Sequence, residues 1–273
     1  MQVDSKMKFP ASAFAARHQR EALPDAQRNY LANAAEGGLY MTGMAFIAAE
    51  TVLPPIVKSL GGPLWLISLA PSFCIIGLSA TPVFMIHIME RYPRKLPVLI
   101  FNGFFTRLPI LAAAFCLLFL ASSHPFVTLA AVVLAPLFNG LINGAVSPAW
   151  FEMFSKTVPP ERRASLLGLR MVIAGLGGLL AGFLISKILS AHSGAFGYGL
   201  LYFLCFLFMA FSLATYFLVK EHPLPPQRGR NFQSLGESLA EIPSLFRRDG
   251  DLRSFFIARI FICAPYAAFP FLS

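Results

Sequence analysis

Residues 87–97 read HIMERYPRKLP, and this short charged stretch separates two long apolar windows of the sequence. The window before it covers residues 64–86, and the window after it covers residues 96–121. Each window has about the 20 residues that an α-helix needs to cross a bilayer. A charged connection this short therefore predicts a turn at one membrane surface between two spanning helices.

The composition of the whole chain also predicts a membrane location. Of the 273 residues, 56% are hydrophobic and 13% are charged, whereas soluble domains carry about 25% charged residues. Apolar windows of spanning length recur at residues 38–59, 64–86, 96–121, 125–150, 165–189 and 196–219, with a borderline seventh at 254–273. We therefore predict an all-α integral membrane protein, a six-transmembrane-helix bundle plus a partial seventh helix.

The Lys and Arg residues predict how these helices are oriented. With a cytoplasmic N-terminus, seventeen of the 22 Lys and Arg residues lie in cytoplasmic segments, and only Lys58 and Lys187 lie in outer loops. Such an asymmetry is what the positive-inside rule describes. We expect a multi-pass protein of the bacterial cytoplasmic (inner) membrane. Its net charge of +9 then comes from residues that flank the spans, and no nucleic-acid partner is expected.

Four parts follow from these windows. We predict a cytoplasmic tail over 1–36, the six-span bundle over 37–219, a cytoplasmic linker with an amphipathic helix over 220–253, and the start of a seventh span over 254–273. The last stretch, FIARIFICAPYAAFPFLS at 256–273, would reach only ~27 Å as a helix, short of the ~30 Å hydrocarbon core. The expectation is a truncated half that lacks a C-terminal six-helix bundle, or else a half that works as a homodimer.

The charged loop also carries a resemblance to a known family. Its pattern is Ile86, three further residues, and then Glu90-Arg91-Tyr92-Pro93-Arg94-Lys95. This resembles the loop motif of the major facilitator superfamily, with the acid and the three bases in register and the two glycines of the motif replaced by Ile86 and Pro93. The resemblance covers about residues 36–273 and implies a bundle of 3+3 inverted repeats that works by alternating access. It also implies a conformational gate at Glu90, Arg91, Arg94 and Lys95, although ordinary positive-inside charge is the alternative explanation.

Residues 147–185 are similar to the fourth-to-fifth span region of the same superfamily. A proline-rich turn with Arg162 and Arg163 leads into a glycine-rich helix, in which Gly175, Gly178 and Gly182 would allow close helix packing. The Gly-Pro pair of the drug/proton antiporter branch is absent from this helix, which argues against multidrug export.

Two charged residues within the predicted spans are the first candidates for function. Glu50 and Arg107 each lie about 11 residues from the cytoplasmic end of their windows, ~17 Å deep at ~1.5 Å per residue. Glu50 would be a protonatable coupling site, and Arg107 a partner for Glu50 or for an anionic substrate. The alternative is an ion pair that only orients two helices.

Other polar residues in the spans receive more ordinary interpretations. Asn102, Asn139 and Asn143 are candidates for a substrate site, although buried amides more often bond to a neighbouring helix. His87 and Glu152 are expected at the cytoplasmic interface. Arg170 is expected to reach the same interface or to pair with Glu152, and Arg259 would lie near the start of span seven.

These features favour secondary transport of a small solute, with possible coupling to protons, over other functions. A rhomboid-like intramembrane enzyme would need a Gly-x-Ser-Gly setting and a mid-span His, whereas Ser147 stands in AVSPA and the histidines fall near span ends or in loops. No Walker A motif, CxxC pair or metal-ligand spacing is present, so we expect no enzyme activity, cofactor or metal. A non-transporting receptor or assembly scaffold remains the alternative.

Overall fold

The computed structural model describes residues 25–90, 92–222 and, beyond them, residues 236, 243–244, 246–251, 253–254, 257–258 and 261, without the side chains of Val83, Ile86, His87 and Glu90. Each secondary-structure element within 25–90 and 92–222 is helical. In chain order they are α2 (Ala26–Ala45), α3 (Leu53–Ser59), α4 (Leu64–Leu69), α5 (Ser72–Ala80), α6 (Pro82–Glu90), α7 (Leu96–Phe115), the π-helical η2 (Cys116–Leu120), α8 (Pro125–Thr157), α9 (Pro160–Ala191), α10 (Ala195–Thr215) and the 3₁₀ turn η3 (Tyr216–Leu218).

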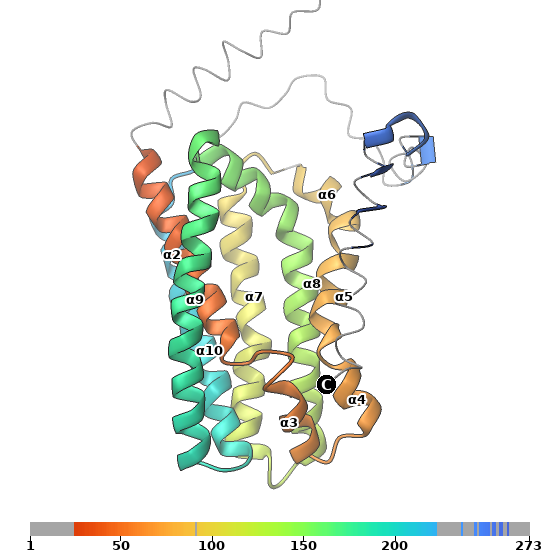
Figure 1. Cartoon of the computed structure of the whole chain (residues 1–273), viewed down its shortest axis with the longest axis vertical. Helices are drawn as coiled ribbons and strands as arrows, with labels where there is room; N and C mark the ends of the chain where they lie inside the picture. Colours follow the sequence, from red (N-terminus) through yellow and green to blue (C-terminus); the bar gives the residue numbers. More distant parts are fainter. Residues whose placement is uncertain are drawn as a thin grey trace, which may run out of the picture.

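Within the described residues, four helices are long and apolar enough to cross a membrane. They cover Leu96–Leu120, Pro125–Thr157, Pro160–Ala191 and Ala195–Leu218. These helices match four of the six predicted windows, and Figure 1 shows them running side by side along the long axis of the bundle. The prediction of an all-α membrane protein is therefore confirmed for the described residues, which contain four helices of membrane-spanning length.

The first two predicted windows are interrupted instead of continuous. Window 38–59 holds the end of α2, a non-helical break over residues 46–52, and α3. Window 64–86 is divided among α4, α5 and α6, whose divisions fall at Pro71 and Pro82. Proline has no N–H to continue the preceding turn, so it often marks such a boundary.

Helix α2 starts at Ala26, inside the segment that we expected to be an N-terminal tail. Hydropathy placed the start later because the first turns of α2 carry polar side chains. The structure buries three of these side chains, Asn29, Asn33 and Glu36, inside the bundle. A buried polar residue lowers the hydropathy of a window without exposing the helix to water.

Helix α5 packs very closely against α8. A Cβ added at Gly140 would collide with the carbonyl oxygen of Cys74, and one at Gly144 would collide with Thr81 Oγ1. On the other side of the bundle, a Cβ at Gly177 of α9 would collide with Thr42 of α2. Small residues at these positions let the helix backbones approach one another.

The glycines that we predicted for close packing behave differently. A Cβ built at Gly175, Gly178 or Gly182 would have no described atom within 4 Å beyond the neighbouring backbone of its own helix. Gly175 and Gly182 are exposed and Gly178 is half-buried on α9, which buries a smaller share of its residues than the other three long helices. Close helix contacts are found at other glycines instead, Gly140, Gly144 and Gly177 among them.

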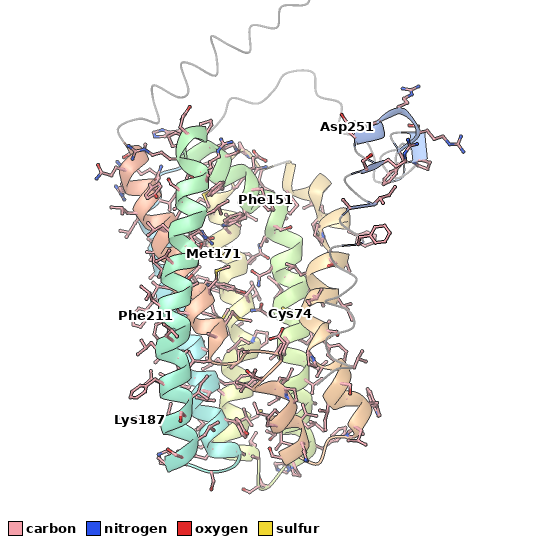
Figure 2. All side chains as sticks on the ribbon, in the orientation of Figure 1. Cys74, Phe151, Met171, Lys187, Phe211 and Asp251 are labelled. Atoms are coloured by element: carbon pink, nitrogen blue, oxygen red, sulfur yellow. The ribbon has the colours of Figure 1, made fainter. Side chains whose placement is uncertain are left out.

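The two ends of the bundle differ in how many Lys and Arg residues they hold. One end holds the start of α2, the end of α6 and the α8–α9 turn, and the opposite end holds α3 and α4 (Figure 1). In Figure 2, Phe151 lies toward the first end and Lys187 toward the second. The described Lys and Arg residues near the helix ends at the first end are Arg28, Arg94, Lys95, Lys156, Arg162, Arg163 and Lys220.

Candidate functional site

A cavity of about 400 Å³ lies among the helices. Helices α2, α5, α7, α8 and α9, together with η3, contribute its lining. The lining residues are Glu36, Tyr40, Leu78, Leu99, Gly103, Thr106, Arg107, Asn143, Val146, Ser147, Trp150, Phe151, Arg170 and Tyr216. Charged and polar groups thus share this cavity with aliphatic and aromatic side chains.

The three charged lining residues lie at similar depths along their helices. Glu36 and Arg170 are each ten residues past the first residue of α2 and α9, and Arg107 is eleven past the start of α7. At ~1.5 Å per residue, these positions are ~15–17 Å from the helix starts. That depth is about half of a ~30 Å hydrocarbon core.

Glu36 and Arg170 form a buried ion pair. Glu36 Oε2 lies 3.0 Å from Arg170 Nη1. The same nitrogen donates to the carbonyl oxygen of Asn33 at 2.9 Å, and the guanidinium stands 5.1 Å from the centroid of the Trp150 ring. A Cβ at Gly37 would collide with this guanidinium, so glycine leaves the space that Arg170 occupies.

Arg107 is buried without a carboxylate partner among the described residues. Its Nε donates to the carbonyl oxygen of Met209 at 2.8 Å, and its Nη1 donates to Gly103 O and Thr106 Oγ1, each at 2.8 Å. The residue is only 6% exposed, and no described carboxylate oxygen lies within 4.0 Å of its guanidinium. Neutral oxygens therefore hold this cation at the cavity.

An amide network connects three of the helices beside the cavity. Tyr40 donates its hydroxyl to Asn139 Oδ1 at 3.1 Å. Asn143 Nδ2 lies 3.1 Å from the Tyr40 hydroxyl and 3.0 Å from Asn139 Oδ1, and donates to both. Asn139 Nδ2 donates in turn to the carbonyl oxygen of Thr106 at 3.4 Å. The network joins α2, α7 and α8 and orients the polar side of the cavity.

Of the five candidates from the sequence, the structure brings Arg107, Asn139 and Asn143 together at this site. Asn102 instead donates to Val98 O of its own helix at 2.9 Å. Glu50 is exposed in the break between α2 and α3 and forms no ion pair with Arg107. The expected pairing of Glu50 with Arg107 is therefore absent, because α2 begins at Ala26 and ends before Glu50 is reached.

Arg170 also differs from the sequence expectation. It neither reaches the interface nor pairs with Glu152, because α9 begins at Pro160 and Arg170 is nearly three turns inside it. Glu152 does lie near the end of α8, as expected, but its partners are Lys95 at 3.1 Å and Lys156 at 2.6 Å.

These lysines belong to an ionic cluster at one end of the bundle, formed by Lys95, Glu152, Lys156 and Glu221. Lys156 lies 3.6 Å from Glu221. The Glu221 carboxylate accepts hydrogen bonds from the backbone N–H groups of Lys95 at 2.8 Å and Leu96 at 2.7 Å. Glu221 thus caps the start of α7, whose own N-cap residue provides no side-chain bond.

The predicted gate residues fall partly within this cluster. Lys95 is almost completely buried, and its Nζ also donates to Met89 O. Arg94 is exposed. The Glu90 side chain and Arg91 lie outside the described residues, as does Arg259 in the predicted seventh span.

A second contact at the same end attaches α2 to the segment after η3. Asn29 Nδ2 donates to Lys220 O at 3.0 Å, and Lys220 N donates to Asn29 Oδ1 at 2.8 Å. Asp25 lies 3.1 Å from Lys220 Nζ and 3.3 Å from His222 Nε2. The hydrogen bond from Lys220, together with the contact to His222, holds the pKa of Asp25 below its ordinary value of 3.8.

Sequence reasoning missed Glu36 and Tyr40, although a signal for them exists. Residues 29, 33, 36 and 40 are spaced by four, three and four, which places Asn29, Asn33, Glu36 and Tyr40 on one helix face. This polar stripe crosses residue 36, where we expected the tail to end. In the described part of the chain, no group of three or more His, Cys, Asp or Glu side chains is arranged to hold a metal ion.

A comparison with protein families gives a match over most of the chain. The family model described as Major Facilitator Superfamily matches residues 36–273. Neither the curated proteins nor the solved structures contain a significant match.

Proposed function

Since the chain belongs to the Major Facilitator Superfamily, we propose that it is one six-span half of a secondary transporter that moves a small solute by alternating access. The observation that carries this proposal is the cavity of about 400 Å³ between the helices. Its charged lining residues lie ~15–17 Å along their helices, and substrate sites of such transporters lie near the bilayer midplane.

The proposal includes six crossings, with two of them interrupted. Residues 26–59 would form the first crossing through α2 and α3, and residues 64–90 the second through α4 to α6. Broken helices are tolerated in membranes where they line a cavity or pack inside protein. Six crossings place residues 25 and 222 on one side, in agreement with the contact between Asp25 and His222.

We further propose that this side is cytoplasmic and that the ionic cluster at Lys95 belongs to the conformational gate. The cluster joins the start of α7, the end of α8 and the segment after η3 through charge-assisted contacts. Contacts of this kind stabilise one arrangement of helix ends over another. Alternating access needs a second body that moves against this one, so the proposal includes a further six-helix bundle, either in the same reading frame or from a second copy.

Glu50 stays a proposed site of proton coupling. It is an exposed carboxylate within the non-helical break of the first crossing. Replacing Glu50 by Gln should then abolish proton-coupled uptake. Unchanged uptake in this variant would remove the coupling role and leave the transport proposal intact.

The test of transport is uptake into proteoliposomes that contain the protein encoded by the complete reading frame. A suitable panel is labelled alanine, glucose, uridine, choline and benzoate. The Ser147→Trp variant should block uptake of any solute that is transported, because Ser147 lines the cavity and indole is far larger than hydroxymethyl.

Ser155→Trp is the matched control. Ser155 is on the same helix, and each of the two hydroxyls donates to the carbonyl oxygen three residues earlier, but Ser155 is exposed. If Ser147→Trp and Ser155→Trp reduced uptake equally, this result would contradict transport through the cavity. No uptake of any probe above empty liposomes would favour a non-transporting scaffold.

A further inference from the structure

The charges around the cavity do not cancel. Two cations, Arg107 and Arg170, and one anion, Glu36, line it. Glu36 is already engaged by Arg170 at 3.0 Å. One positive charge, that of Arg107, is therefore left without an anion among the described residues.

An uncompensated charge at this depth is costly, so its retention needs a reason. Ionisable groups within membrane spans are rare, and they commonly mark the path of a substrate or an ion. The contacts of Arg107 to Met209 O, Gly103 O and Thr106 Oγ1 satisfy hydrogen-bond donors without neutralising the charge. These contacts also fix the guanidinium in place, so an arriving anion would meet a preorganised cation.

The remaining walls of the cavity indicate what accompanies the anionic group. Leu78, Leu99, Val146, Trp150 and Phe151 line it as apolar or aromatic surface. A small inorganic anion would leave this surface uncovered, whereas an organic body would bury it. Apolar walls with a few oriented polar groups are typical of sites for small organic molecules.

We propose that the cavity selects small organic monoanions, with a carboxylate placed at Arg107 and an apolar or aromatic body placed against the Trp150 side. The inference rests on the proposed function and adds a substrate class to it. Cations are disfavoured, because the carboxylate of Glu36 is occupied by Arg170 and Arg107 repels them. Neutral solutes of the same shape lose the attraction to Arg107.

The test compares three probes of nearly equal size: benzoate, benzamide and benzylamine. Their affinities for the full-length protein in detergent are measured by isothermal titration at neutral pH. Benzoate should bind at least about tenfold more tightly than benzamide, as expected for a charge-assisted contact in a buried site, and benzylamine should bind more weakly than both. Benzamide or benzylamine binding as tightly as benzoate would overturn the proposal.

Variants then locate the charge that makes the difference. Arg107→Gln should bring the affinities for benzoate and benzamide within about twofold of each other, whereas Arg107→Lys should keep most of the preference because it keeps the charge. Arg28→Gln removes an exposed cation at the start of α2 and should change neither affinity. A preference for benzoate that survives Arg107→Gln would assign the anion to another site and overturn the proposal.

The design also separates this inference from the proposal of transport. Uptake of a neutral or cationic probe, together with no preference for benzoate, would support the proposal of transport and contradict the proposal of an anion site. Preferential binding of benzoate with no uptake of any probe would support the proposal of an anion site and contradict the proposal of transport. If Arg107→Gln does not fold, the three-probe comparison on the unmodified protein still decides the charge preference.

Discussion

The ionic cluster at the bundle end and the cavity within the bundle both combine basic and acidic side chains, but in different proportions. The cluster combines two lysines with two glutamates, Lys95 and Lys156 with Glu152 and Glu221, and its charges cancel. The cavity combines Arg107 and Arg170 with Glu36 alone, and it keeps one positive charge. The charges of the balanced cluster neutralise one another, whereas the uncompensated charge of the cavity is the basis of the proposed anion site.

The largest expected loss of stability comes from removing the one described anion that lines the cavity. Glu36→Gln leaves Arg170 buried without its counter-ion, and breaking a buried ion pair in this way costs about 3–5 kcal/mol. Unfolding of the variant by SDS titration in mixed micelles should show a loss of this size.

The control for this variant is the double substitution Glu36→Leu with Arg170→Met, which removes both charges and keeps similar volumes. It should be more stable than Glu36→Gln, because no unpaired charge remains. Equal stability of Glu36→Gln and the unmodified protein would show that the Glu36–Arg170 pair does not hold α2 against α9.

A smaller loss is expected at the balanced cluster. Glu221→Gln weakens the cap on the N–H groups of Lys95 and Leu96 and the contact with Lys156, and cap substitutions cost about 0.5–2 kcal/mol. The same SDS titration measures it. Glu161→Gln is the control, because Glu161 is in the first turn of α9 but exposed, and it should cost less. A loss at Glu221 as large as that at Glu36 would remove the distinction between the two regions.

The smallest effect concerns Asp25, at the same end of the bundle. Because Lys220 and His222 lower its pKa below 3.8 in the folded protein, the ionised carboxylate stabilises the fold above pH 3.8. This contribution is lost as pH falls through the lower folded-state pKa. Asp25→Asn should therefore lower the melting temperature at neutral pH, and the difference from the unmodified protein should shrink below about pH 4. A difference that stays constant down to pH 3 would contradict the lowered pKa.

Much of the fold was accessible from the sequence, because long apolar helices have a simple signature. The windows at 96–121, 125–150, 165–189 and 196–219 correspond to four long helices. The prediction was less accurate for α2, whose buried Asn29, Asn33 and Glu36 lower its mean hydropathy. Hydropathy treats such residues as solvated, whereas here protein groups contact them. Asn33 donates to Asn29 O within α2, Asn29 bonds the backbone of Lys220, and the Glu36 carboxylate contacts Arg170 of α9.

The site was predicted in part. Arg107, Asn139 and Asn143 were recognised because charged and amide side chains stand out within apolar windows. Arg170 was recognised as a charge but given the wrong partner, since the start of its helix was placed at residue 165 instead of Pro160. Glu36 and Tyr40 were missed because residue 36 was assigned to the tail.

The sequence by itself determined which segments are apolar enough to enter a membrane and which connections carry the positive charge. Those properties depend on composition within a window and hardly change when a boundary moves by a few residues. Only the tertiary structure decided that Glu36 pairs with Arg170 and that Arg107 has no described anionic partner. Each residue along a helix turns the side chain by about 100° and raises it by ~1.5 Å, so the partner of a charge depends on where every helix begins and how the helices pack.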